Sequence, residues 1–185
     1  MNLKWKTKEV VVVAMVAAVI GVLYTVMDYL YMPLSGFLGP VFMELTFGIY
    51  LLSAALPMFL VRKPGVALFG ALVTAGVNIL LGSAYGIQIV LAGALQAAGI
   101  ELGYLLFSRY KGNFANMAVG GILAACFVFV RDYFVFGYST LSFGMLAGMM
   151  AVRLVSAVVL GALLVKGISA ALAKTGVLKG FAAGK

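Results

Sequence analysis

The chain has 185 residues, of which 65% are hydrophobic and 10% charged, whereas soluble domains average about 45–50% apolar and about 25% charged residues. This composition excludes an ordinary water-soluble domain. Lys and Arg total 13 against 5 Asp and Glu, a formal net charge of +8. Histidine is absent and Cys126 is the single cysteine, so disulfide frameworks, zinc sites and His-dependent triads lack the residues that they need.

Apolar segments along the chain predict six transmembrane helices, because a bilayer core of about 30 Å takes roughly 20 apolar residues in helical conformation. In chain order, the expected spans cover residues of about 10–31, 41–61, 65–81, 87–107, 114–136 and 143–168. The first run has no convincing cleavage boundary, so a retained span is expected rather than a signal peptide. The segments also lack the alternating polar residues of a membrane barrel. We therefore expect an all-α, six-transmembrane-helix bundle in which residues 1–185 form one membrane domain.

The basic residues are concentrated in alternate connections of this pattern. They precede the first span, lie between the second and third and between the fourth and fifth, or are near or after the end of the sixth: Lys4, Lys6, Lys8, Arg62, Lys63, Arg109, Lys111, Lys166, Lys174, Lys179 and Lys185. The positive-inside rule assigns that side to the cytoplasm, together with both termini, in a bacterial cell membrane. The excess charge therefore marks orientation, and a nucleic-acid partner is the weaker interpretation.

Polar side chains within the spans are the main functional candidates, because a charged group near the bilayer centre costs about 2.5–3.5 kcal/mol. Most lie in the outer halves of the expected spans: Asp28, Glu44, Asn78, Gln88, Arg131 and Asp132, with Gln96 and Arg153 deeper. Aromatic residues accompany them, either as an interfacial belt or as the walls of a pocket. Glu44 has two readings as well, since it either reaches water at the end of a span or binds a ligand.

Charge pairing is expected between helices. Arg131 and Asp132 are neighbours that point about 100° apart on a helix, so we expect each to find a partner elsewhere. Arg153 lies in mid-span, where Asp132 and Glu101 are the acids able to reach it, and for Arg153 with Glu101 a buried structural ion pair is slightly favoured over a functional role.

A stripe of small residues on the first span, Ala14, Ala18 and Gly21, indicates either close internal packing or contact with a membrane partner. The sequence contains no phosphate-binding GxxxxGK[ST] loop, which favours a substrate-capturing subunit that borrows its motor. Two alternatives remain. One is a self-sufficient proton-coupled carrier with Glu44, Glu101 and Asp132 as relays; the other is a membrane enzyme, which lacks a recognisable nucleophile and base.

Short motifs in matching order resemble the YkoE family along the whole chain: Gly39-Pro40, the segment from Glu44 to Tyr50, Arg62-Lys63-Pro64-Gly65, Gln96 to Glu101, Arg153-Leu-Val-Ser156 and the tail from Thr175 to Lys185. This family comprises thiamine or hydroxymethylpyrimidine S-components of energy-coupling factor (ECF) transporters. The resemblance implies a vitamin-binding subunit that is not an enzyme, holds no cofactor or metal, and works with a transmembrane coupling protein and cytoplasmic ABC ATPases. In S-components, small residues on the first helix contact the coupling protein, which here implies Ala14, Ala18 and Gly21.

Thiamine would suit the polar residues in the spans. Its aminopyrimidine suits carboxylates and amides, and its thiazolium cation suits aromatic faces. The expected acceptors are Glu44 and Asp132, the expected amides are Asn78, Gln88 and Gln96, and the expected aromatic walls are Phe47, Tyr85, Tyr133 and Tyr138. Phosphorylated forms would need basic groups at the mouth, where the connections have none, which favours the unphosphorylated vitamin.

Overall fold

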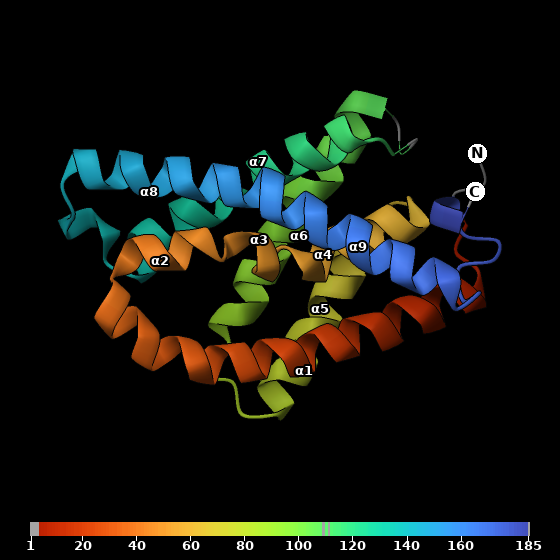
Figure 1. Cartoon of the computed structure of the whole chain (residues 1–185), viewed down its shortest axis with the longest axis horizontal. Coiled ribbons are helices and arrows are strands. Elements are labelled where there is room, and N and C mark those ends of the chain that lie inside the picture. Colours follow the sequence, from red (N-terminus) through yellow and green to blue (C-terminus); the bar gives the residue numbers. More distant parts are fainter. Residues whose placement is uncertain (1–3, 109, 111, 185) are drawn as a thin grey trace.

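The computed structural model describes residues 4–108, 110 and 112–184, and throughout these residues the regular secondary structure is helical, without a strand (Figure 1). The predicted all-α class is therefore confirmed. Arg109, Lys111 and Lys185, which entered the charge pattern, lie outside the described residues. The α-helices are α1 (Thr7–Leu38), α2 (Pro40–Leu45), α3 (Phe47–Tyr50), α4 (Leu52–Val61), α5 (Val66–Leu80), α6 (Gln88–Ser108), α7 (Phe114–Val135), α8 (Phe143–Val155) and α9 (Gly161–Lys174). The π turn η2 (Ser156–Leu160) joins α8 to α9, and 3-10 turns occur at η1 (Tyr138–Thr140) and η3 (Ala182–Gly184).

Four helices of the described chain are long and apolar enough to cross a membrane, over Thr7–Tyr31, Gln88–Phe107, Phe114–Val135 and Phe143–Lys174. They coincide with the expected spans at about 10–31, 87–107, 114–136 and 143–168. The segment expected as the second span, 41–61, is divided among α2, α3 and α4, and the expected third span is the 15-residue helix α5. The described helices are thus those of a multi-pass membrane protein, with four candidate spans of full length and a set of shorter apolar helices.

The division of the second segment has local and tertiary causes. Gly39 has a φ of +76°, which glycine adopts without strain, and Pro40 occupies the first position of α2, where its missing N–H is not needed. Further along, a Cβ added to Gly48 would lie 2.4 Å from the carbonyl oxygen of Ser156. The Gly48 N–H also donates to Ser156 Oγ at 2.9 Å. The backbone of α3 therefore packs directly against the π turn η2.

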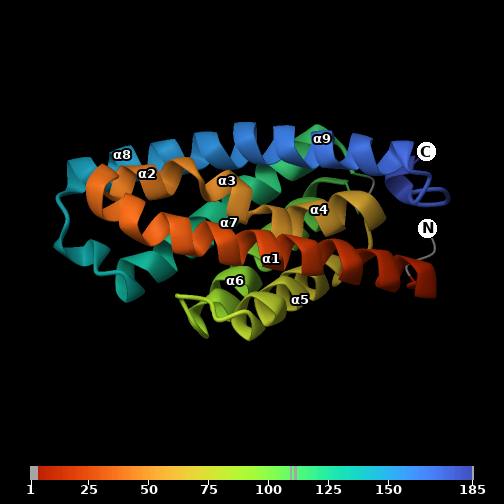
Figure 2. The ribbon, with the colours of Figure 1, turned by 60° about the horizontal axis from the view of Figure 1, so that its bottom comes forward.

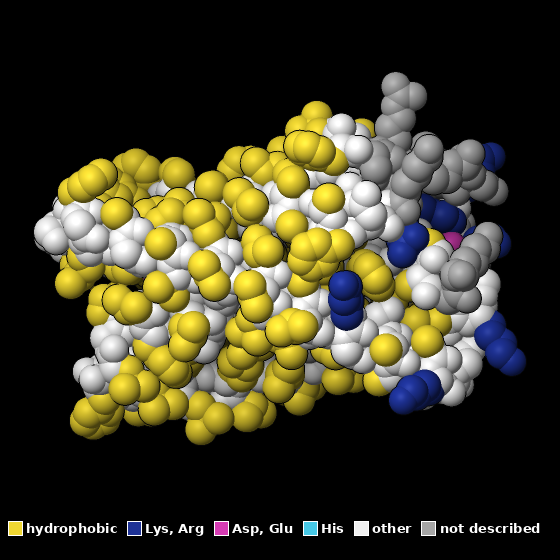
Figure 3. Space-filling model, turned by 45° about the horizontal axis from the view of Figure 1, so that its top comes forward, with side chains coloured by type: hydrophobic (Ala, Val, Ile, Leu, Met, Phe, Trp, Pro, Cys, Tyr) yellow, Lys and Arg dark blue, Asp and Glu magenta, His cyan; other side chains and the backbone are white. Residues whose placement is uncertain are grey.

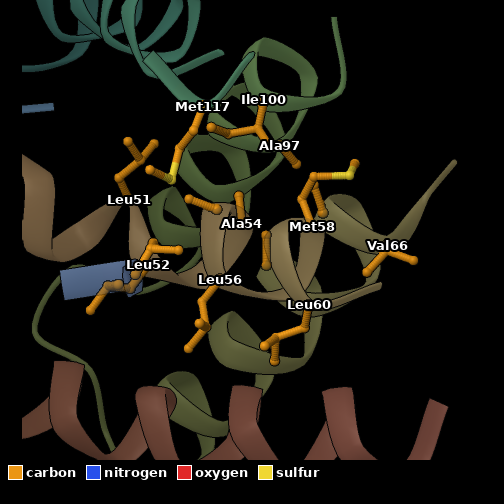
Figure 4. Close-up of a cluster of buried hydrophobic side chains, with 14 of the residues drawn as sticks. Leu51, Leu52, Ala54, Leu56, Met58, Leu60, Val66, Ala97, Ile100 and Met117 are labelled. Carbon is orange, nitrogen blue, oxygen red and sulfur yellow. The ribbon is translucent and has the colours of Figure 1, made fainter. Parts of the chain in front are cut away.

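Helix α4 forms the centre of the core, between α1 and α9 (Figures 1 and 2). All of its residues except Phe59 are buried. Figure 4 shows Met58 of this helix next to Ala97 and Ile100 of α6, whereas Leu56 and Leu60 point to the opposite side of α4. Glycines allow the neighbouring helices to approach closely: Gly70 lies against Pro57 of α4, Gly99 against Ala124 of α7, and Gly103 against Gly120 of α7. Burial on nearly every side explains why all residues of α4 except Ser53 are apolar.

The two ends of the molecule differ in charge. Both termini lie at one end in Figure 1, and Figure 3 shows the Lys and Arg side chains of the visible face gathered toward that end. The remainder of this face is largely hydrophobic, as expected of a surface that meets lipid.

Candidate functional site

A cavity of about 130 Å³ lies at the end of the protein away from the termini, with room for about ten water molecules. It is enclosed by the second halves of α1, α5 and α7, the first half of α6, and residues of α2, α3, α4, η1 and α8. Its polar lining includes Asp28, Ser53, Thr74, Asn78, Gln88, Gln96, Arg131, Asp132 and Arg153. Its aromatic lining comprises Tyr24, Tyr31, Phe47, Tyr50, Tyr85, Phe136 and Tyr138.

An ion cluster of Glu44, Arg131, Asp132 and Arg153 lies along the α2–α7–α8 wall of the cavity. Arg153 Nη2 donates to Asp132 Oδ2 at 2.6 Å and to Glu44 Oε1 at 2.9 Å, and its Nε pairs with the other Glu44 oxygen. Arg131 Nε donates to Asp132 Oδ1 at 3.0 Å. Two positive and two negative side chains are therefore joined, so the ion cluster carries no net formal charge.

Aromatic side chains hold the ion cluster in place. Tyr138 OH donates to Glu44 Oε1 at 3.0 Å. The Arg153 guanidinium lies 5.0 Å from the ring centroids of both Phe47 and Phe129. Burial, followed by the negative charge of Glu44, raises the pKa of Tyr138 above its ordinary value, so the hydroxyl keeps its proton and remains a donor. The guanidinium is thus held by its carboxylates in the plane and by rings on its faces.

Two predictions about ion pairing were wrong. Arg153 does not pair with Glu101, whose carboxylate instead accepts from Ala67 N and from Tyr110 OH, each at 3.1 Å. Glu101 caps the start of α5 from the second half of α6, outside the cavity lining. Arg131 and Asp132 do pair with each other, since the long guanidinium side chain can fold back across the 100° that separates their Cβ directions. Asp132 also has the expected partner on another helix, which is Arg153.

Asp28 lies on the opposing α1–α5 wall. Its Oδ1 accepts from Tyr50 OH at 3.0 Å, and its Oδ2 accepts from Asn78 Nδ2 at 3.0 Å and from Ser83 Oγ at 3.3 Å. The side chain is buried, with 1% exposure, and none of the ion pairs among the described residues includes it. Asp28 is therefore surrounded by neutral donors and not by a cation.

Four lining residues carry a buried polar atom without a partner in the described part of the chain. These atoms are Asn78 Oδ1, Gln88 Oε1, Arg131 Nη1 and Arg153 Nη1. Buried polar groups are nearly always hydrogen-bonded, and these four belong to residues that line the same cavity. They comprise two acceptors and two donors. A small polar heterocycle that has both donor and acceptor groups could form hydrogen bonds with both kinds of atom.

The structure brings most of the predicted site residues together. Seven of them line the cavity: Phe47, Asn78, Tyr85, Gln88, Gln96, Asp132 and Tyr138. Two do not. Glu44 has 0% exposure and lies behind the lining, where its carboxylate binds Arg153. Tyr133 is on the outer side of α7 with 36% exposure. The expectation that Glu44 and Tyr133 contact a ligand directly is therefore corrected.

Sequence reasoning missed several lining residues. Asp28 was recognised as a polar residue of the outer half but not as a member of the site. Tyr24 and Tyr31 stand four residues before and three after Asp28, a spacing that places all three on one helical face and could have identified them. Tyr24 and Tyr31 both pack against Tyr50, with ring centroids 5.0 and 6.0 Å apart.

The small-residue stripe of α1 divides in two. A Cβ added to Gly21 would lie 2.8 Å from both Thr74 O and Val77 Cβ of α5, so Gly21 serves internal packing and the expectation of partner contact is wrong there. Ala14 and Ala18 are half-buried. Contact of these two alanines with a partner stays a prediction.

Comparison with known proteins places the chain among transport proteins along nearly its whole length. Residues 8–127 match the family described as the ABC-type cobalt transport system, permease component. YkoE of Bacillus subtilis (strain 168), named as an HMP/thiamine permease protein, is 35% identical over 182 residues, which cover 98% of this chain and 91% of that protein. A crystal structure of an S-component of an ECF transporter has a TM-score of 0.90 at 34% identity, over 96% of this chain and 90% of the other. These relatives are transporter subunits and not enzymes, and the chain belongs to the YkoE family of ECF-transporter S-components.

Proposed function

We propose that this chain captures thiamine or its precursor hydroxymethylpyrimidine from the extracellular side of a bacterial cell membrane, as the substrate-binding subunit of an ECF importer. The observation that carries the proposal is the cavity in which four buried polar atoms have no partner among the described residues. The name of the B. subtilis relative supports the choice of substrate.

The lining is chemically suited to the aminopyrimidine ring. The amino group of the aminopyrimidine would donate hydrogen bonds to the side-chain oxygens of Asn78 and Gln88. The ring nitrogens would accept hydrogen bonds from the free Nη1 groups of Arg131 and Arg153. Gln96 lines the same space, where its Oε1 already accepts from Ser53 Oγ at 3.3 Å. Phe47, Tyr85 and Tyr138 supply ring faces, and a cation over such a face gains about 0.5–2 kcal/mol.

We also propose that the chain is a single membrane domain with six spans and cytoplasmic termini. Helices α2 to α4 together would make the second span, and α5 the third. The gathering of Lys and Arg at the end that holds both termini supports this orientation (Figure 3). The cavity would then face the opposite, extracellular side.

The partners proposed for the chain are a transmembrane coupling protein and cytoplasmic ABC ATPases. The proposed contact surface on α1 is centred on Ala14 and Ala18. Their small side chains would allow a helix of the partner to pack closely against α1. Exposed apolar residues flank them, including Val11, Met15 and Val19. This surface lies in the half of α1 nearer the basic end, toward the compartment of the ATPases.

Mass spectrometry of ligand retained after mild detergent purification tests the proposed substrate, followed by calorimetric titration of ligand-free protein. We expect thiamine or hydroxymethylpyrimidine to be retained and to bind again. Failure of both compounds to bind would refute the proposal. Liposomes that contain this protein alone should not accumulate thiamine when a pH gradient is imposed, and accumulation would instead establish a proton-coupled carrier.

A further inference from the structure

The formal charges that line the cavity are balanced on one wall and unbalanced on the other. The ion cluster on the α2–α7–α8 wall joins two arginines to two carboxylates. Asp28 on the α1–α5 wall accepts hydrogen bonds from a phenol, an amide and a hydroxyl, all neutral. The lining and the ion cluster together therefore have a formal charge of −1 that belongs to Asp28.

We infer that Asp28 is the counter-ion for a positively charged ligand, and that the cavity selects a monocation over a neutral molecule of the same shape. This inference rests on the proposed function and deepens it, since it separates thiamine, whose thiazolium ring is cationic, from its neutral pyrimidine precursor. A buried carboxylate without a paired cation is unfavourable in a low-dielectric site. A cationic ligand would remove that imbalance on binding.

The aromatic residues around Asp28 support this assignment. Tyr24 and Tyr31 line the cavity and each packs against Tyr50, and Tyr85 completes the lining on this side. Ser83 links Tyr85 to the carboxylate, since its Oγ donates to Asp28 Oδ2 at 3.3 Å and accepts from Tyr85 N at 3.2 Å. Ring faces and a carboxylate are the surroundings in which proteins hold organic cations.

The same charge balance disfavours phosphorylated ligands. Arg131 and Arg153 each retain a free Nη1, but their positive charges are already matched by Glu44 and Asp132. A phosphate would therefore bring uncompensated negative charge into a site that also holds Asp28. The free Nη1 groups suit neutral acceptors such as ring nitrogens or a hydroxyl.

Calorimetric titration at pH 8 tests the inference with three ligands: thiamine, an isosteric thiamine analogue whose thiazolium is replaced by a neutral thiophene, and hydroxymethylpyrimidine. The wild-type protein is expected to bind thiamine at least about tenfold more tightly than the neutral isostere, a ratio that corresponds to about 1.4 kcal/mol. In Asp28→Asn, this ratio should fall to about one, because thiamine affinity decreases and affinity for the isostere is retained.

Glu101→Gln is the matched control, since it makes the same carboxylate-to-amide change at a half-buried position outside the cavity. It should keep the wild-type ratio. Equal binding of thiamine and the isostere by the wild-type protein would overturn the inference without any variant, and so would an unchanged ratio in Asp28→Asn. If neither thiamine nor hydroxymethylpyrimidine binds to the wild-type protein, the proposed function itself fails, which is a distinct outcome.

Discussion

Substitution of Arg153 should destabilise the protein more than substitution of any other member of the ion cluster. Its guanidinium is the shared partner of Glu44 and Asp132. Removing one partner of a buried pair costs about 3–5 kcal/mol, because the remaining charge is left uncompensated. In Arg153→Gln, Glu44 keeps only the Tyr138 hydroxyl and Asp132 keeps Arg131, so we expect a loss of about 4 kcal/mol within that range.

Glu44→Gln should be milder, at about 2 kcal/mol, since Arg153 retains Asp132 as a charged partner. The double variant should lose about 4 kcal/mol, which is about 2 kcal/mol less than the sum of the single losses, because the two residues share one interaction. For a chain of this length, 4 kcal/mol corresponds to a fall in the unfolding temperature of about 8–16 °C.

Thermal unfolding of the purified protein, followed by far-UV circular dichroism in one detergent at one heating rate, measures these effects. Lys174→Gln is the control. It removes a positive charge from an exposed position on α9, the α-helix that comes after the α8 helix of Arg153. The reasoning is refuted if Arg153→Gln unfolds at the temperature of Lys174→Gln, or if the losses of the two single variants simply add in the double variant.

Three further predictions concern packing, the aromatic support of the ion cluster, and the ligand. Gly48→Ala should lower the unfolding temperature by several degrees, since the added Cβ would lie 2.4 Å from Ser156 O. Gly144→Ala is the control and should not lower it, because nothing lies within 4 Å of a Cβ added there. Equal shifts in the two variants would contradict the close contact at Gly48. Tyr138→Phe removes the hydrogen bond to Glu44 and should cost about 1 kcal/mol, visible as a shift of about 2–4 °C in the same assay, and no shift would argue against that bond. Gln88→Met removes an unpaired acceptor from the lining and should weaken thiamine binding about tenfold, and an unchanged titration would exclude this amide from the contacts.

Hydropathy and length were sufficient to predict the long helices. Helices α1, α6, α7 and the α8–α9 rod each contain a continuous apolar run, and such a run of about 20 residues has few alternatives to a membrane span. The division of the second apolar segment could not be read in this way, because its pieces are all apolar. It depends on the contact of Gly48 with Ser156, more than a hundred residues later in the chain.

Depth along a helix predicted much of the cavity but not the pairing of its charges. Counting residues from the outer ends placed Asn78, Gln88 and Asp132 in the outer halves of their spans, and they share one cavity. Pairing also depends on how each helix is rotated about its axis. That rotation turns Arg153 toward Glu44 and directs Glu101 to the start of α5. The rotation of a helix about its axis could not be predicted from the positions of the residues in the sequence.

The balanced ion cluster also has an electrical consequence. Moving one elementary charge across a membrane potential of 100 mV involves about 2.3 kcal/mol. Two arginines and two carboxylates that travel together contribute no net charge to any movement of the site through that field. With a monocation at Asp28, the loaded site is neutral and its movement is independent of voltage, whereas the empty site carries −1 and its return responds to the potential. Under the proposed role of Asp28, the cavity itself would therefore contribute a voltage-dependent term only when no cation is bound.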